Sequence, residues 1–500
     1  MIKDPLYFMF LNDGIFRQYD IRGIAGKELN RDIAIIIGMA FGTYVNAKLR
    51  TLNSKPNSHA DKFAQRNIKI ISSFPDLIGE SRKKELDSLV KPKNDIFGAK
   101  VSVGRDVRLS SDDLASGIIE GITSSGIDVY DIGICPTPLQ YFSIYHLNLD
   151  GGIMITGSHN PPEYNGFKIS IGKETIHGKD IQRLKEIALN QAEAKVKAEE
   201  KKKGRVEKYD IIDAYKRYML NEFGYLSDSK FKRLKVVVDA GNGTAGDIVP
   251  EILTFIGCDV IPLYCEPDGN FPNHHPDPTV VEYIHDLIHE TKKSGADIGV
   301  GYDGDADRIG VIAKDGNIVW GDQIMTVLSR ELLKRNKGAK IIGDVKCSQF
   351  MFDDIQRNGG IPIMWKTGHS LIKQKMKDEE ALLAGEFSGH IFIKDRYFGY
   401  DDAIYTTLRL IEIMKTTGKD IKELLSDVPK TYHTPEIRID CPDDKKKDVV
   451  EQVVSKFIKY KENGNAPYHI RDIVTIDGIR IVFDKGWGLV RASNTQPVVV

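Results

Sequence analysis

Lys100-Val101-Ser102-Val103 opens a stretch that continues for the length of a helix and ends in Gly126-Ile127-Asp128-Val129. The succession of strand, helix, glycine and strand predicts a βαβ unit, whose crossover connection makes the two strands parallel. The same succession returns twice, from Lys235-Val236-Val237-Val238 to Gly257-Cys258-Asp259-Val260 and from Lys340-Ile341-Ile342 to Gly360-Ile361-Pro362-Ile363. Three such units in order predict three similar α/β domains.

The length and composition agree with a chain of several domains. At roughly 150 residues per domain, 500 residues correspond to about three domains. The 70 Lys+Arg and 71 Asp+Glu give a net charge of −1, which offers no basic field for nucleic acid. With 41% hydrophobic residues the chain can bury several cores. The five cysteines show no Cys-x-x-Cys pair, so we expect a reducing compartment rather than a disulfide framework or a zinc knuckle.

The apolar stretches near the N-terminus argue against a membrane segment. The longest uncharged one, residues 33–45, is shorter than the ~20 residues that span a bilayer and is typical of a buried helix. The run 6–11 is too short for the core of a signal peptide. We therefore expect a cytoplasmic protein with no membrane partner.

The texture of the chain changes after Thr431. Residues 436–440 alternate like a half-buried strand, and residues 444–457 predict a helix with a charged face. Asp477-Gly478 and Lys485-Gly486 predict hairpin turns between short strands. This pattern predicts a fourth, smaller α+β domain.

Two polar stretches interrupt this plan. Residues 51–98 lack sustained periodicity and predict a surface insertion. Residues 192–203 are rich in Lys, Glu and Ala and predict a solvated helix that ends at Gly204. We expect domain limits of 1–203, 204–316, 317–430 and 431–500.

The first candidate site is the loop Thr156-Gly157-Ser158-His159-Asn160-Pro161-Pro162, which follows an apolar run. Ser158 lies just past the carboxyl end of a predicted strand, where α/β sheets bind their ligands. The turn at Asn165-Gly166 can bring the Lys168 amine near the Ser158 hydroxyl. A serine needs a base or a cation to act as a nucleophile at neutral pH. The alternative is an Asn-Pro turn with a structural serine and a surface lysine.

The second candidate site, Gly301-Tyr302-Asp303-Gly304-Asp305-Ala306-Asp307-Arg308, also follows a predicted strand. Three carboxylates at alternate positions repel one another unless a divalent cation lies among them, and oxygen ligands favour magnesium or calcium. An EF-hand is excluded, because its sixth and twelfth positions are Arg308 and Lys314 here instead of Gly and Glu. Arg308 beside a metal suits a phosphoryl group that bridges the two. The alternative is a solvated acidic loop.

Two further loops carry polar side chains between glycines or small residues. In Gly385-Glu386-Phe387-Ser388-Gly389-His390, Glu386 and Ser388 can hydrogen-bond the vicinal hydroxyls of a sugar, and His390 can exchange a proton near neutral pH. Arg491-Ala492-Ser493-Asn494-Thr495 combines one cation with three small polar side chains, as a phosphate-binding loop does. Each loop alone could be an ordinary polar turn. Together the four candidates predict phosphoryl transfer on a sugar phosphate.

On these residues the chain resembles the α-D-phosphohexomutase family, and within it the phosphomannomutase/phosphoglucomutase branch, nearly from end to end. Phe16-Arg17-Gln18-Tyr19-Asp20-Ile21-Arg22-Gly23 resembles the opening motif of that family. The four loops resemble its phosphoserine, magnesium, sugar and phosphate loops. The resemblance implies three mixed-sheet α/β domains and a smaller C-terminal α+β domain around a central cleft. It also implies reversible phosphoryl transfer between the 1- and 6-positions of a hexose phosphate, through a phosphoserine and a hexose 1,6-bisphosphate.

The resemblance also implies roles for individual residues. One Mg²⁺ per chain would be held by Asp303, Asp305, Asp307 and the phosphate on Ser158. Proton transfer or phosphate stabilisation would fall to Arg22, Lys168, His390 and Arg308. Lys168 can act as a base only if its pKa is lowered, and the metal and Arg22 would lower it. Glu386 and Ser388 would hold the 3- and 4-hydroxyls of the sugar. The distal phosphate would be held by Tyr19, Lys346, His369, Arg491, Ser493, Asn494 and Thr495.

The sequence departs from this family in two places. Residues 51–98 are extra, and the chain stops five residues after Thr495. We therefore expect a less stable fourth domain with an exposed apolar face. We also expect a monomer or weak dimer. Three alternatives stay open: a phosphoglucosamine mutase, a metal-dependent sugar-phosphate phosphatase, and a sugar-phosphate-binding protein without turnover.

Overall fold

A computed structural model describes residues 11–53, 98–193, 203–430, 432, 434, 436–442, 444–493 and 498–500. The predicted insertion at 51–98 and the predicted linker helix at 192–203 lie almost entirely outside these residues. Asn494 and Thr495 lie outside them as well.

The first domain is a mixed sheet flanked by helices. Its strands are β1 (Ile21–Ile24), β2 (Lys100–Arg105), β3 (Asp128–Ile134), β4 (Gly151–Ile155), β5 (Tyr164–Ile171), β6 (Glu174–Thr175) and β7 (Val206–Lys208). Its helices are α1 (Arg31–Asn53), α4 (Ser111–Ser124), α5 (Thr137–His146) and α6 (Lys179–Glu193), with a short 3₁₀ turn at Asp13–Ile15. The strands follow the order β1-β5-β4-β2-β3-β7, with β6 beside β5. Because β7 pairs with β3, the first sheet extends past residue 203.

The second and third domains contain one sheet each. The elements of the second are α7 (Ile211–Phe223), a 3₁₀ turn (Gly224–Ser227), β8 (Leu234–Asp239), α8 (Val249–Phe255), β9 (Cys258–Leu263), α9 (His285–Ser294), β10 (Ile298–Tyr302), β11 (Ile309–Ala313) and β12 (Ile318–Val319). Those of the third are α10 (Gly321–Arg335), β13 (Lys340–Asp344), α11 (Gln349–Arg357), β14 (Ile361–Trp365), α12 (His369–Glu379), β15 (Leu383–Gly385), β16 (Ile391–Ile393), α13 (Ala403–Thr417) and α14 (Ile421–Leu424).

All three sheets share one topology. The common order is β3-β2-β4-β5 in the first, β9-β8-β10-β11 in the second and β14-β13-β15-β16 in the third. In each, the first three strands are parallel and the fourth runs antiparallel to the third. The three βαβ units and the three similar mixed-sheet domains predicted from the sequence are therefore confirmed.

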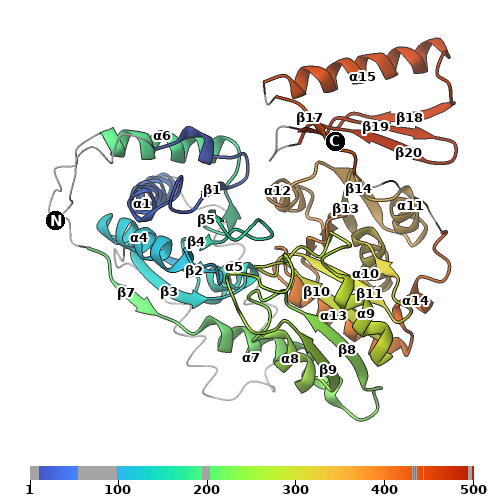
Figure 1. The fold of residues 1–500 in the computed structure, drawn as a ribbon, viewed down its shortest axis with the longest axis horizontal. Coiled ribbons are helices and arrows are strands. Elements are labelled where there is room, and N and C mark those ends of the chain that lie inside the picture. The colour runs from blue at the N-terminus through green and yellow to red at the C-terminus, as the bar shows by residue number, and fades with distance from the viewer. Residues whose placement is uncertain are drawn as a thin grey trace.

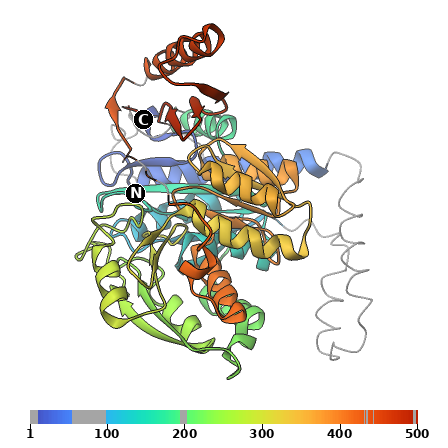
Figure 2. The same ribbon diagram turned by 90° about the vertical axis from the view of Figure 1, so that its right-hand side faces the viewer.

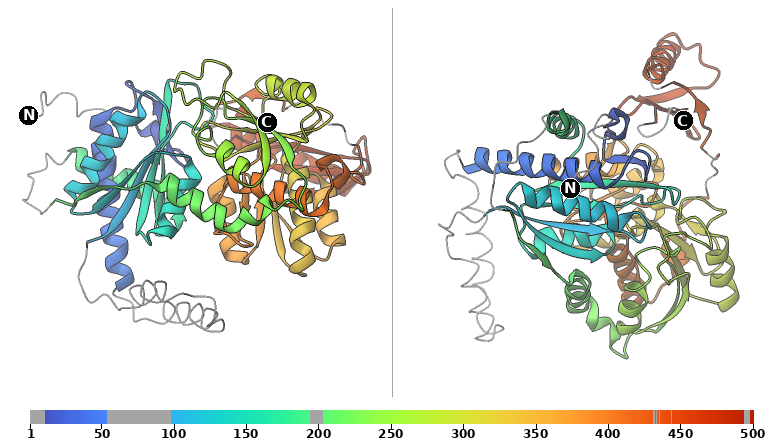
Figure 3. Two further views of the ribbon diagram at one scale, coloured as in Figure 1. Left: turned by 90° about the horizontal axis from the view of Figure 1, so that it is seen from below. Right: turned by 60° about the vertical axis from the view of Figure 1, so that its left-hand side comes forward.

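The second and third domains share one hydrophobic core. Helix α13 follows the third sheet, yet it packs against α7 and β11 of the second domain as well as α10 and β16 of the third. Every residue from Ala403 to Lys415 is buried, including the charged Arg409 and Glu412, because neighbouring elements enclose the helix on every side. Figure 3 shows the first domain on one side of the molecule and the second and third domains together on the other.

Helix α1 meets the length and composition of a membrane span over Arg31–Thr51, with a mean hydropathy of 1.2. This corrects the prediction that the apolar stretch is too short. Within the structure α1 packs along α4, and 44% of the span is buried. A Cβ on Gly121 of α4 would lie 2.1 Å from the Ile35 carbonyl oxygen, so glycine permits this close approach. Helix α1 is thus a core helix of the first domain.

The fourth domain is small and lies at one end of the molecule. Its elements are β17 (Ile439–Asp440), α15 (Lys446–Asn463), β18 (Ile470–Val474), β19 (Ile479–Phe483), β20 (Trp487–Val490) and β21 (Val498–Val499). Strands β18, β19 and β20 form an antiparallel sheet with turns where the sequence predicts them. Figures 1 and 2 show α15 on the outer side of this sheet. The α+β prediction is confirmed.

Two predictions for this domain need correction. Helix α15 begins later and ends later than the predicted 444–457. The half-buried strand predicted over 436–440 is wrong, because only β17 forms and pairs with the equally short β21. Ile437 and Ile439 are 67% and 62% exposed, since little structure covers either face of this segment.

Candidate active site

The three site loops of the α/β domains occupy the same place in the shared topology. The Ser158 loop joins β4 to β5, the Asp303 loop joins β10 to β11, and the Glu386 loop joins β15 to β16. Each is thus the connection between the third parallel strand and the antiparallel fourth strand. Since the third strand points its carboxyl end at this loop in every domain, the fold presents equivalent edges of three sheets to one site.

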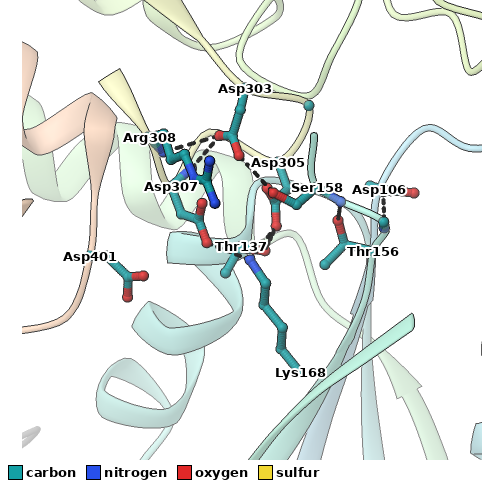
Figure 4. Close-up of polar contacts among 12 residues, drawn as sticks. Asp106, Thr137, Thr156, Ser158, Lys168, Asp303, Asp305, Asp307, Arg308 and Asp401 are labelled. Carbon is teal, nitrogen blue, oxygen red and sulfur yellow. Dashed lines mark hydrogen bonds and ion pairs between the residues drawn. The ribbon is translucent and has the colours of Figure 1, made fainter. Parts of the chain in front are cut away.

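Ser158 is buried and faces the carboxylates of the second domain. Its Oγ donates to Asp303 Oδ2 at 2.7 Å and lies 3.0 Å from Nδ1 of His159. Its backbone has φ +50°, a left-handed conformation that costs a non-glycine residue energy. Figure 4 shows Ser158 and Lys168 pointing from the first domain toward the aspartates.

Two residues that the sequence did not single out hold this loop in place. The buried Arg108 guanidinium donates to the carbonyl oxygens of Ser158 (2.8 Å), Asn160 (2.5 Å), Pro161 (2.5 Å) and Tyr164 (2.9 Å). Asp106 accepts from the Gly157 N–H at 3.0 Å and pairs with Arg108. Asp106 and Arg108 follow the carboxyl end of β2, which lies beside that of β4. Their position just after a strand end is the sequence signal that could have identified them as site residues.

The carboxylates of Asp303, Asp305 and Asp307 form a compact, buried cluster. One oxygen from each lies within 4.8 Å of the others. Asp303 Oδ1 accepts from the backbone N–H groups of Asp307 and Arg308, both at 3.0 Å. Burial and the neighbouring carboxylates of Asp307 and Asp305 raise the pKa of Asp303 well above its usual range. Such mutual repulsion is relieved by a bound cation.

Residues of the first domain reach into this cluster. Lys168 Nζ donates to Asp305 Oδ2 at 2.7 Å and also contacts Asp307. Thr137, at the start of α5, donates its hydroxyl to Asp305 Oδ2 at 2.5 Å and its N–H to the Asp305 carbonyl at 2.9 Å. Thr137 is a further residue that sequence patterns missed, because it lies at a helix start far from either loop.

The charged groups that surround Lys168 act on its pKa. Burial opposes its charge, but the Asp305 and Asp307 carboxylates raise the pKa of Lys168 well above its usual value. The direction is opposite to the predicted lowering, because two carboxylates contact the amine. Arg22, which was predicted to lower this pKa, instead pairs with Asp20 at 2.6 Å.

The third domain contributes imidazole and charged groups that continue from Arg308 of the second domain. Arg308 Nε donates to His390 Nε2 at 2.9 Å, and His390 Nδ1 lies 3.2 Å from Asp401 Oδ2. The imidazole of His369 stacks on that of His390 with centroids 5.7 Å apart. Lys373 Nζ donates to Asp401 Oδ1 at 3.0 Å. The structure therefore brings the predicted residues Arg308, His390 and His369 together.

The predicted sugar-binding side chains lie beside these groups. Glu386 Oε1 accepts from the Gly368 N–H at 2.6 Å, next to His369. Burial raises the pKa of Glu386. Ser388 is partly buried in the same loop, and Phe387 between them stacks on Trp320 at 5.4 Å.

Three of the residues predicted to hold the distal phosphate, Tyr19, His369 and Arg491, meet around residues 367–369. Tyr19 Oη donates to the Thr367 carbonyl at 3.5 Å, and its ring meets His369 edge to face. Asp477 Oδ2 accepts from the Thr367 N–H at 3.2 Å and from Arg491 Nε at 3.0 Å, which brings the fourth domain to the same place. Lys346 pairs with Glu436 at 2.6 Å, and Ser493 is buried.

Three mixed-sheet α/β domains meet around a serine and a carboxylate cluster, and a fourth, α+β domain contacts the third nearby. This arrangement is that of a class, the phosphohexomutases. Family models for the phosphoglucomutase/phosphomannomutase alpha/beta/alpha domains match in succession, domain I over residues 87–195, domain II over 213–316 and domain III over 320–432. The model for the C-terminal domain of the same family matches residues 436–500.

Individual relatives agree over nearly the whole chain. A phosphomannomutase/phosphoglucomutase of Pseudomonas putida is 42% identical over 494 residues, which cover 98% of this chain and 91% of that protein. A phosphoglucomutase of Neisseria gonorrhoeae is 39% identical over 487 residues, 97% of this chain and 92% of that protein. The crystal structure of a phosphoglucomutase/phosphomannomutase family protein from Burkholderia thailandensis superposes with a TM-score of 0.79 at 36% identity, covering 98% of this chain and 93% of that one.

The chain belongs to the phosphoglucomutase/phosphomannomutase family of α-D-phosphohexomutases, and it is an enzyme of the isomerase class.

Proposed function

We propose that this enzyme transfers a phosphoryl group reversibly between the 1- and 6-positions of a hexose phosphate, with Ser158 as the phosphorylated residue. The observation that carries the proposal is the 2.7 Å contact between Ser158 Oγ and Asp303 Oδ2 across two domains. A buried serine hydroxyl beside carboxylates, in a strained backbone conformation, lowers the stability of the fold. Strain of this kind is typical of a position that takes part in a reaction.

The acidic cluster fits a divalent cation. Its ligands are hard oxygens, and Asp305 Oδ1 and Asp307 Oδ1 are buried without a hydrogen-bond partner among the described residues. Asp303, Asp305 and Asp307 would hold the ion together with a phosphate oxygen on Ser158, and oxygen ligands in this number suit Mg²⁺. The metal would neutralise the phosphoryl charge during transfer.

Cationic side chains of this chain would complete the phosphoryl site. Lys168 and Arg308 lie on either side of the carboxylates and would stabilise the transferring group as fixed positive charges. Since Lys168 Nζ donates to the Asp305 carboxylate at 2.7 Å and also contacts Asp307, we assign it a role as proton donor or fixed charge. Arg22 and His390 would exchange a proton with the substrate hydroxyl or stabilise its phosphate.

The substrate would bind between the third and fourth domains. Glu386 and Ser388 would hold ring hydroxyls. Tyr19, Lys346, His369, Arg491, Ser493, Asn494 and Thr495 would hold the distal phosphate, whichever end of the sugar carries it. A hexose 1,6-bisphosphate would be the intermediate. The limits 1–203, 204–316, 317–430 and 431–500 stay our proposal for the domains, with β7 and β12 as strands that lie just past a limit and join the preceding sheet.

Incubation of the protein with glucose 1-phosphate, Mg²⁺ and a bisphosphate activator tests this function. We expect glucose 6-phosphate and, by intact mass, a phosphate that maps to Ser158. Ser158→Ala should lower kcat by orders of magnitude, whereas Ser170→Ala, a buried serine on β5 away from the metal loop, should not.

Other products identify the alternatives. Release of free phosphate would indicate a phosphatase, and absence of any product would indicate a binding protein. Faster turnover of glucosamine phosphates than of glucose phosphates would indicate a phosphoglucosamine mutase. Each of these results would contradict the proposal.

A further inference from the structure

Asp401 is a buried carboxylate that joins three side chains of the site. It lies just before α13 and is 0% exposed. Its Oδ1 accepts from Lys373 Nζ at 3.0 Å, and its Oδ2 lies 3.2 Å from His390 Nδ1 and 3.7 Å from His369 Nδ1. Although burial opposes its charge, the ammonium of Lys373 holds the pKa of Asp401 well below its usual range.

The hydrogen bond at Nε2 of His390 fixes the tautomer of its ring. Arg308 Nε can only donate, so His390 Nε2 must accept and the ring proton must lie on Nδ1. Nδ1 points into a space shared by Asp401 Oδ2 at 3.2 Å and Asp307 Oδ1 at 3.6 Å. Among the described residues, neither Nδ1 nor Asp401 Oδ2 has a properly directed hydrogen bond. Such contacts commonly tighten when substrate binds.

We propose that Asp401 is a positioning residue that holds His390 in the Nδ1–H tautomer and keeps its Nε2 lone pair directed at the reacting groups. The proposal rests on the proposed function for its catalytic consequence. Asp401 is the nearer of the two carboxylates, and Asp307 already belongs to the acidic cluster. A carboxylate that accepts from a catalytic imidazole sets its tautomer and supports the charge that the ring acquires with a proton.

Both oxygens of Asp401 are needed in this role. Lys373 donates to one and His390 would donate to the other, so the side chain must accept twice. An asparagine offers one oxygen, which the Lys373 ammonium would claim, and it would turn its NH₂ group toward His390 Nδ1–H. Two donors would then face each other, and the imidazole would lose the tautomer or the orientation.

Asp401→Asn tests the inference. We expect kcat to fall by about 100-fold, as for loss of a general acid–base group, with a smaller change in KM. Histidine ¹⁵N NMR on the labelled full-length protein reads the ring directly without substrate. In the unchanged protein His390 should carry its proton on Nδ1, and in the variant this tautomer should no longer dominate.

Asp402→Asn is the matched control. Asp402 is the neighbouring buried aspartate, but it accepts from the hydroxyls of Tyr215 and Tyr397, which lie outside the site. Asparagine still caps a helix, so α13 should form. We expect the kcat and the His390 tautomer of Asp402→Asn to match those of the unchanged protein.

Two results would overturn the inference: a proton on Nε2 of His390 in the unchanged protein, or an Asp401→Asn protein that keeps the Nδ1–H tautomer and full kcat. Failure of the proposed function is a different result, namely no conversion of sugar phosphate by the unchanged protein. In that case the tautomer measurement alone decides whether Asp401 positions His390.

Discussion

At Ser158 the backbone adopts a conformation that its side chain disfavours, and the surrounding residues maintain it. The φ of +50° costs of order 1–3 kcal/mol, which the neighbouring hydrogen bonds must offset. Arg108 supplies four of them from one rigid guanidinium, and Gly157 leaves the room, since a Cβ there would lie 2.4 Å from Arg108 Nε. The position of Ser158 is therefore set by a side chain 50 residues away.

We predict that Arg108→Lys lowers kcat by about 100-fold, because an ammonium cannot reach four carbonyl oxygens at once and the serine would shift by a fraction of an ångström or more. Steady-state kinetics with glucose 1-phosphate measure this. Arg105→Lys is the control, since Arg105 pairs with Asp112 and Asp131 and does not touch the loop. Equal kcat in Arg108→Lys and the unchanged protein would contradict the role.

At the scale of elements, the loop between the third and fourth strands of the shared topology carries site residues in all three α/β domains. Neighbouring segments of each domain hold this loop in place. In the second domain, the segment between β9 and α9 lies over the loop that carries Asp303, Asp305 and Asp307. A Cβ on Gly304 would be 3.5 Å from Pro276, and a Cβ on Gly241 would be 3.0 Å from it. His274 fastens this segment, because its Nε2 lies 3.1 Å from both oxygens of Asp239 at the end of β8.

The His274–Asp239 pair predicts a pH-dependent contribution to stability. Burial opposes the imidazolium, but the bond to Asp239 raises the pKa of His274 above its usual value of 6.5. A raised pKa means that the stabilisation is complete below pH 6.5 and is lost as the pH rises through the folded-state pKa. His274→Gln should therefore cost about 1–2 kcal/mol of unfolding free energy at pH 5.5 and less at pH 9.

Urea unfolding at the two pH values measures the difference. His285→Gln serves as the control, because His285 is 80% exposed and should cost little at either pH. A cost for His274→Gln that stays constant or grows with pH would show that the pair is not charged in the folded protein.

At the scale of the whole molecule, the fourth domain is attached to the third through side chains such as Arg480, Asp477 and Lys346. Its own core is a small cluster that includes Ile470, Ile479 and Ile481, packed against α15. Its main buried link to the third domain is Arg480 on β19, which donates to the carbonyl oxygens of Val345 and Cys347, both at 2.7 Å. These carbonyls flank Lys346, so one contact sets both the domain position and a proposed phosphate-binding side chain.

We predict that Arg480→Met loosens the fourth domain. Hydrogen exchange of β18, β19 and β20 should accelerate, while exchange of the enclosed strand β8 should not change. KM for sugar phosphate should rise about tenfold, as for a loss of about 1.4 kcal/mol of binding, with kcat changed less. Arg471→Met, at an exposed position on β18, is the control. Unaltered exchange in β18–β20 would contradict the link.

Local sequence patterns predict the three α/β domains and several of the loops that form the candidate site. The apolar runs that begin β2, β8 and β13, and the glycines before β3, β9 and β14, predict three parallel βαβ units because alternation and turn chemistry act over a few residues. The polar loops at strand ends predict Ser158, the three aspartates and Glu386, because carboxyl ends of parallel strands gather ligands.

The tertiary structure alone decided the partners of these residues. Arg108, Thr137, Lys373, Asp401 and Arg480 stand in segments whose local patterns predict only a loop, a helix or a strand. Their roles come from contacts with segments far along the chain, such as the pairing of Thr137 with Asp305, 168 residues away. The partners of Lys168 are decided in the same way, since its amine meets two carboxylates from another domain. Sequence periodicity specifies which face of an element is buried, but the packing of one sheet against another determines which buried charges meet.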